Sequence, residues 1–480
     1  MHAFHHKRLI TADRRISVAF LLLSVSIVSF FSHVCLIAQT TQQETLADQG
    51  MFQYPDSLSV SNHLYDLSSV ESLTLSSADI DSTFSNIADL AWLRPIAVQN
   101  RLILFGESHY YRTIDHLSTR MLFAVNTFDS YPFVSFEHEY SRGILYDHFV
   151  QIKDENEARE FLTEILGQFI TTEEFLTYLE HIREWNLRHP QRLIHVGAHD
   201  IEHGYRETID GILVPFFRQA DPSFKIDPAD ISADRLDMLI EMLRGRLKNL
   251  DTTKTTPLFG CITKPYVETV LDNLLSFFNS RQYQFDYYRQ RAILRNLTDE
   301  RFHGRHLRHG KVFLHIGAYH AATMAYPEGM NLFREGSFFK HEFALTKGKT
   351  YSISAECHVF RFEPMATVDL DTCVRQGGLY VDRIGSFRRA YKAGLAVPSG
   401  FYSVWWSFDC FDSLMTAKAY QVDHRPMLLR SIRWESCIRN GASADQRATL
   451  SNERRKMEPY DAVIWVSRSD ITRARSKAVK

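Results

Sequence analysis

The chain lacks an excess of charge of either sign. Its 480 residues include 55 Lys and Arg against 57 Asp and Glu, which gives a formal net charge of −2 at pH 7. Proteins that bind nucleic acids carry a basic field on the surface that meets the phosphates. The balanced charge therefore predicts no nucleic-acid partner, and the partner that we expect is a small-molecule substrate.

Cysteine is scarce, and the cysteines that occur are far apart. Of six in total, Cys35 lies in an N-terminal apolar stretch. The other five are Cys261, Cys357, Cys373, Cys410 and Cys437. None has the close pairing of a cysteine metal site, so that kind of site is excluded. Disulfide pairing among the five stays open, although an odd number leaves at least one thiol out.

Long apolar runs are absent beyond the N-terminus. There, four basic side chains precede an apolar stretch over 16–31, and small residues follow up to Ala38. This order predicts a signal peptide over 1–38, and hence an exported protein that is periplasmic or secreted. An uncleaved anchor stays open as the alternative, because 16–38 could just span a bilayer. We expect no other contact with a membrane.

Four short apolar runs end on acidic or histidine side chains. They begin at Arg101, Phe133, Arg192 and Val312. Their ends are Gly106-Glu107-Ser108-His109, Glu137-His138-Glu139, Gly197-Ala198-His199-Asp200 and Gly317-Ala318-Tyr319-His320. Helical pattern fills the gaps, which predicts an α/β fold with a mainly parallel central sheet flanked by helices. Ligands bind at the carboxyl ends of strands in such a sheet, so we expect one polar pocket there.

The predicted domain has a boundary and an insertion. Residues 39–80 are rich in Ser, Thr, Gln and Asp with little periodicity, which predicts a flexible lead before a domain over 81–480. The gap between the third and fourth runs is far longer than a strand crossover needs. Apolar stripes at helical spacing predict a large helical insertion at about 205–300. This insertion is either a lid over the pocket or a helical layer packed on the sheet.

Several of these segments resemble the erythromycin esterase-like family, within a wider group that includes ChaN-like haem-binding proteins and Tiki-like proteases. The first run ends like that family's Gly-Glu-x-x-His-Gly motif, although one residue rather than two separates Glu107 from His109. Glu137 falls at its strand-terminal Glu. The segment 289–297 is similar to its Arg-Asp-x-x-Met-Ala-x-Asn-Leu helix, and 312–320 resembles its strand ending in His-Asn-x-His.

The resemblance, which covers roughly 85–470, implies a hydrolase of ester or lactone bonds that needs no cofactor. The catalytic residues that it implies are Glu107, His109, Glu137 and His320. His109 would act as general base on water, with a carboxylate stabilising the imidazolium. Arg291, with Asp200 and His199, would bind the substrate if its helix faces the pocket. The alternative is that Glu107 and His109 only brace the turn after the strand.

Metal-dependent and non-catalytic functions stay open beside the esterase interpretation. Side chains that could bind Zn or Mn, as in a Tiki-like hydrolase, are His109, Glu137, His199, Asp200 and His320. The segment 199–203 has a metal-like composition, but a solvated polar loop would look the same. A ChaN-like protein would instead bind haem or another ligand without catalysis. Its haem ligands here would be Tyr110, Tyr111 or His116.

Overall fold

The computed structural model describes ten stretches of the chain. They are 71–109, 111–228, 230–250, 256–283, 285–300, 303–323, 334–362, 400–403, 425–430 and 460–470. All of them belong to a single unit made of Leu58–Gly385 and Ser399–Lys480. The predicted signal peptide, Tyr110 and three cysteines (Cys373, Cys410 and Cys437) lie outside the described residues.

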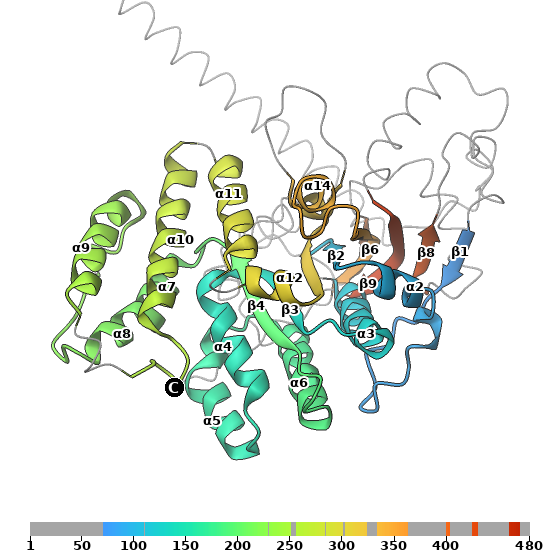
Figure 1. The fold of residues 1–480 in the computed structure, drawn as a ribbon, viewed down its shortest axis with the longest axis horizontal. Helices are drawn as coiled ribbons and strands as arrows, with labels where there is room; N and C mark the ends of the chain where they lie inside the picture. Colours follow the sequence, from blue (N-terminus) through green and yellow to red (C-terminus); the bar gives the residue numbers. More distant parts are fainter. Residues whose placement is uncertain are drawn as a thin grey trace, which may run out of the picture. The chain divides into compact units, whose positions relative to one another are not determined.

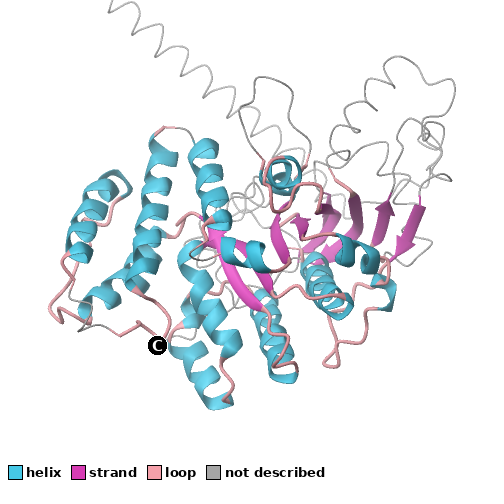
Figure 2. Ribbon diagram, in the orientation of Figure 1, coloured by secondary structure: helices cyan, strands magenta, loops and turns pink. Residues whose placement is uncertain are grey.

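One sheet runs through the described residues (Figure 2). Its strands are β1 (Glu71–Thr74), β2 (Leu102–Glu107), β3 (Phe133–Glu139), β4 (His195–Asp200), β5 (Val312–Gly317), β6 (Thr350–Phe362), β7 (Gly400–Ser403), β8 (Met427–Arg430) and β9 (Ala462–Asp470). Their order is β1-β8-β9-β6-β2-β5-β3-β4, and β7 pairs with β6. Neighbours from β9 to β4 run parallel, whereas β1, β7 and β8 pair antiparallel. The predicted α/β fold with a mainly parallel sheet is confirmed.

Helices connect the parallel strands. They are α2 (Leu93–Gln99), α3 (Arg112–Phe128), α4 (Tyr140–Gln151), α5 (Glu155–Glu164), α6 (Glu173–Arg188), α7 (Tyr205–Thr208), α8 (Val214–Arg218), α9 (Leu236–Lys248), α10 (Lys264–Gln282), α11 (Phe285–Thr298), α12 (Gly304–His309), α13 (Ala318–Ala321) and α14 (Glu335–His341). A π-helical turn, η5 (Ile209–Leu213), joins α7 to α8. Helix α6 begins where its sequence favours a start, because the Thr172 hydroxyl accepts a hydrogen bond from the Phe175 N–H.

Both faces of the central strands are covered, which explains why the strands are apolar on both sides. On one face, the buried core consists of Leu102, Leu104, Phe133, Val312, Leu314 and Ile316 of the strands, packed with Ile293, Leu297 and Leu307 of α11 and α12, and with Ala321 and Phe339. On the other face, the rings of Phe105 and Phe313 stack with centroids 6.2 Å apart. Phe136 meets Tyr178 of α6 there, with ring centroids 5.1 Å apart.

The segment between β4 and β5 is helical, as its apolar stripes predict. Helix α11 contacts β4 and sends Ile293 and Leu297 into the core, so this part of the segment is a packed layer rather than a lid. Helix α10 contacts α11, and α9 contacts α10 (Figure 1). The segment therefore extends away from the sheet beyond its β4 edge.

The predicted lead over 39–80 is too long at its C-terminal end. Glu71–Thr74 forms β1, whose residues pair in antiparallel register with those of β8. Leu75 and Ile80, which follow it, are buried. This edge strand has only four residues, too few for its alternation to stand out from a polar background.

Across the stretches that the structure covers, we find no helix with the length and apolar character needed to cross a membrane.

Candidate active site

Four neighbouring parallel strands bring polar side chains to one edge of the sheet. Glu107 and Asp200 are the last residues of β2 and β4, and Glu137 lies near the end of β3. His320 lies in α13, which follows directly after Gly317 at the end of β5. In the sheet, β5 lies between β2 and β3, and β4 lies beside β3. The carboxyl edge is where α/β folds bind their ligands.

His109 is hydrogen-bonded to the carboxylate two residues before it. Its Nδ1 lies 2.8 Å from Glu107 Oε1, and its side chain is 37% exposed. Burial disfavours the charged form, but the hydrogen bond and charge of Glu107, with the charge of Glu137, raise the pKa of His109 to about 9. Burial also opposes charge on Glu107, yet the charges of His315 and His109 hold its pKa well below the usual range. Both members of the pair are therefore charged at neutral pH.

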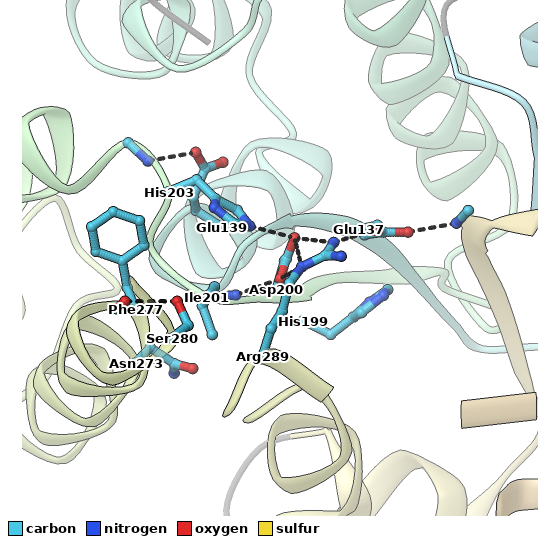
Figure 3. Close-up of polar contacts among 12 residues, drawn as sticks. Glu137, Glu139, His199, Asp200, Ile201, His203, Asn273, Phe277, Ser280 and Arg289 are labelled. Carbon is cyan, nitrogen blue, oxygen red and sulfur yellow. Dashed lines mark hydrogen bonds and ion pairs between the residues drawn. The ribbon is translucent and has the colours of Figure 1, made fainter. Parts of the chain in front are cut away.

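Arg289 of α11 holds together groups from three strand ends, and Figure 3 shows its contacts with two of them, Asp200 and Glu137. Its Nε lies 2.9 Å from Asp200 Oδ1, and its Nη2 lies 2.7 Å from Asp200 Oδ2. Nη2 also donates to Glu137 Oε1, and Nη1 lies 3.0 Å from His320 Nε2. Burial would raise the pKa of Glu137, but the charges of His320 and Arg289 lower it to about 2. Arg289 thus compensates two buried carboxylates at once.

His320 lies between this arginine and a further buried carboxylate. Its Nδ1 lies 2.8 Å from Oε2 of Glu335, which is fully buried in α14. Its Nε2 faces Nη1 of Arg289, which can only donate. Burial and the charge of Arg289 oppose a positive charge on His320, but the charges of Glu335 and Glu137 and the hydrogen bond to Glu335 raise its pKa above the usual range, and Nδ1 donates to Glu335. His320 is held in one orientation by groups on both sides.

Gly317 links the two halves of the cluster. Its N–H donates to Glu137 Oε2. A Cβ at this position would lie 3.1 Å from Glu137 Oε2 and 3.2 Å from His109 Nε2. The two side chains therefore lie close together beside Gly317, with room between them for no more than one small group. Glu137 Oε1 in turn lies 3.6 Å from His320 Nε2. The structure therefore brings Glu107, His109, Glu137 and His320 together, and their catalytic role stays a prediction.

Arg291, which we expected to bind substrate, is not part of this cluster. Its side chain is exposed, and its Nη1 donates to the hydroxyl of Tyr287 on the same helix. Residues two apart on a helix point about 200° apart, so Arg289 and Arg291 cannot both face the sheet. The sequence contains the signal that selects Arg289, because this residue lies four and eight positions before Ile293 and Leu297, which form the buried stripe.

His199 and Asp200, the other expected substrate-binding residues, have different surroundings. Asp200 belongs to the Arg289 cluster. His199 is buried, its Nδ1 lies 2.9 Å from the hydroxyl of Ser135, and burial lowers its pKa to about 3. It is a neutral group inside the domain beneath the cluster.

The segment 199–203 does not gather its side chains around one point. His203 Nε2 lies 3.2 Å from Asp200 Oδ2. Glu202 instead accepts hydrogen bonds from the hydroxyls of Ser141 and Thr208. The segment is neither a shared set of metal ligands nor a solvated loop, because His199 and Glu202 are fully buried.

The expected haem ligands include one that falls outside the described residues, Tyr110. Tyr111 is buried. The Nδ1 of His116 lies 3.2 Å from the Ser77 carbonyl oxygen, and its Nε2 lies 3.9 Å from Asp79. Neither described side chain is presented openly to a surface ligand.

Comparisons with known proteins add little beyond the fold. No family model matches the chain, and no curated protein matches it. A solved succinoglycan biosynthesis protein is 11% identical, and the alignment covers 88% of this chain and 99% of that protein's chain, with a TM-score of 0.49. A protein from Bacillus cereus is 12% identical, with 85% and 98% coverage and a TM-score of 0.47. A mutant of erythromycin esterase EreC in its open conformation is also 12% identical, with 85% and 99% coverage and a TM-score of 0.43. Similarity at this level says nothing about the reaction.

Proposed function

We propose that this protein is an exported hydrolase that cleaves ester or lactone bonds in a small-molecule substrate. The observation that carries this proposal is the hydrogen-bonded pair of His109 and Glu107 at the carboxyl edge of the sheet, with Glu137 close to the second ring nitrogen of His109. A carboxylate on Nδ1 of a histidine orients the ring and stabilises the imidazolium that forms when Nε2 takes a proton.

In the reaction, neutral His109 takes a proton from water as the water attacks the carbonyl carbon. Glu107 stabilises the resulting positive charge through Nδ1. The protonated ring then supplies the proton that the leaving alkoxide needs. Because the pKa of His109 is about 9, only about one molecule in a hundred has the neutral base at pH 7. The rate is therefore expected to increase with pH up to about 9.

Arg289 has a positioning role in this scheme. Its Nε, Nη1 and Nη2 each already contact Asp200, Glu137 or His320. An arginine with these contacts holds the carboxylates in place, and it has no need of a substrate oxyanion to balance its charge. Glu137 and His320 are thus fixed before any substrate binds, which is the preorganisation that catalysis requires.

The test is a panel of esters and lactones hydrolysed by the full chain in the presence of chelator. We expect His109→Gln to lower kcat by about 10²- to 10⁴-fold while the melting temperature stays close to that of the wild type. The matched control is His309→Gln, because His309 is exposed in α12. The wild-type rate should increase with pH toward 9, and the residual rate of His109→Gln should lack this dependence. Full activity in a folded His109→Gln protein would contradict the proposal.

Export is proposed from the N-terminal sequence alone. Four basic side chains followed by the apolar stretch 16–31 favour secretion, with a mature chain that starts near Gln39. N-terminal sequencing of the secreted or periplasmic protein measures this directly. An intact chain that begins at Met1 in the membrane fraction would show an anchor instead.

A further inference from the structure

A second polar cluster shares Glu107 with the first and lies on the face of the sheet that α3 covers. It consists of Glu107 at the end of β2, Asp115 in α3 and His315 in β5. One ligand atom from each of these side chains lies within 4.8 Å of the other two. Among the described residues, no other group of three or more acidic, histidine or cysteine side chains has its ligand atoms this close together. Atoms that coordinate one ion at about 2.0–2.2 Å lie roughly 3 to 4.5 Å from one another, so the spacing suits a metal.

His315 is aimed into this cluster. The residue is 6% exposed, and its Nε2 makes no hydrogen bond with any described residue. Glu107 Oε2 lies 3.0 Å from Nε2, which makes an ion pair when the ring is protonated, but no hydrogen bond joins the two atoms. A buried ring nitrogen without a hydrogen bond is costly, and coordination of a cation would remove that cost.

The other ring nitrogen of His315 is held as it is in metal sites. Its Nδ1 lies 3.1 Å from the Ser118 hydroxyl, which in turn lies 3.2 Å from the hydroxyl of Tyr178. Histidines that ligate metals use their second nitrogen in this way, and such a partner fixes the tautomer and the plane of the ring. Nε2 is thereby left to face Glu107 and Asp115.

The carboxylate of Asp115 also lacks a partner. No hydrogen bond or ion pair joins it to any residue that the structure describes, and Glu174, a nearby acid, is paired with Arg112 at 3.0 Å. Burial and the charges of Glu107 and Glu174 raise the pKa of Asp115 well above its usual range, because a second negative charge here would be repelled. A cation between Glu107 and Asp115 would take the place of the proton on Asp115 and stabilise both carboxylates in the charged form.

We propose that Glu107, Asp115 and His315 bind one divalent transition-metal ion, with Zn²⁺ or Mn²⁺ as the matching class. One imidazole and two carboxylates suit these ions, whereas Ca²⁺ and Mg²⁺ prefer oxygen ligands alone. Three protein ligands leave one coordination position for water or substrate. The ion uses Oε2 of Glu107, and Oε1 remains on His109. This proposal does not rest on the hydrolase reaction, since the binding is measured without substrate.

The experiment is equilibrium dialysis of the chelator-treated full chain against Zn²⁺ and, separately, Mn²⁺, with the metal quantified by mass spectrometry. We expect about one tightly bound ion per wild-type chain. Asp115→Asn and His315→Gln should each weaken binding by at least about tenfold. Asp115→Asn is nearly isosteric at a partly exposed position, so it keeps the test valid if His315→Gln does not fold. The bound metal should raise the melting temperature of the wild type and not that of Asp115→Asn.

Two controls separate this site from other histidines. His320→Gln alters the neighbouring cluster and should keep the ion. A variant with His2, His5 and His6 replaced tests the histidine-rich N-terminus, and it should also keep the ion. Absence of stoichiometric uptake by the wild type would overturn the proposal. Uptake that persists unchanged in Asp115→Asn, or that is lost only with the N-terminal histidines, would overturn it as well.

Discussion

Replacing Arg289 with methionine would leave two buried carboxylates, Asp200 and Glu137, without the cation that they share. Methionine keeps much of the volume and the apolar stem of the side chain, so the main change is the loss of charge. Removal of one partner from a buried ion pair costs about 3–5 kcal/mol in the free energy of unfolding. The lowered pKa of Glu137 gives a similar figure. A decrease from 4.5 to about 2 corresponds to about 3 kcal/mol, of which Arg289 supplies part.

The loss should depend on pH, and the sign follows from the carboxylates. Because the folded-state pKa of Glu137 is below its unfolded value, its stabilisation is complete above pH 4.5 and disappears as the pH falls toward 2. In the Arg289→Met variant both carboxylates should take up protons at a higher pH than in the wild type. The difference in stability between the two proteins should therefore be largest near pH 7 and should decrease below about pH 5.

The assay is urea unfolding at pH 7.5 and pH 4.5. Arg291→Met is the matched control, because it removes the same charge two residues away on the exposed side of α11. Surface substitutions of this kind change stability by about 0.5 kcal/mol or less. The reasoning would be refuted if Arg289→Met at pH 7.5 were within about 0.5 kcal/mol of Arg291→Met.

Two further predictions concern Glu202 and Gly317. Burial raises the pKa of Glu202 to about 7, so the folded state loses stability as the pH increases from 4.5 to 7. Glu202→Gln should therefore stabilise the protein by about 3 kcal/mol at pH 8 and hardly at all at pH 4.5. An equal effect at both pH values in urea unfolding would contradict this. Gly317→Ala puts a methyl group 3.1 Å from Glu137 Oε2 and 3.2 Å from His109 Nε2, which forces both side chains to move. We expect kcat/KM for the ester substrate to fall by roughly 10- to 100-fold with little change in melting temperature, and an unchanged kcat/KM would mean that this spacing is not critical.

The sequence predicts the strands of the site well because each of them has a strong local signal. Apolar runs buried on both faces, such as Leu102–Phe105, differ from their surroundings over only a few residues, and polar side chains at their ends mark the edge. The order in which the strands lie side by side in the sheet cannot be predicted in this way. Strand β5 lies between β2 and β3, and no property of Val312–Gly317 encodes that order, since pairing is decided by the packing of the whole sheet.

The residues that the sequence analysis missed come from other elements than the strand ends that it identified. Glu335 reaches His320 from a helix that follows it, and Asp115 reaches His315 across about 200 residues. Neither acid stands out among the other charged residues of its segment. Arg289 differs from these acids, because the sequence shows that it lies on the same face of its helix as Ile293 and Leu297. These apolar residues mark the face that packs against the sheet.

The position of Arg289 ties the chemistry of the cluster to the rotational register of one helix. Each residue turns an α-helix by about 100°. Inserting or deleting a single residue between Arg289 and Ile293 would therefore rotate the guanidinium away from Asp200 while the core residues stay in place. Helix α9 contacts α10 rather than the sheet, so its length can change without turning α11. Over evolutionary time, insertions and deletions should accumulate in the outer helices and be excluded from the first two turns of α11.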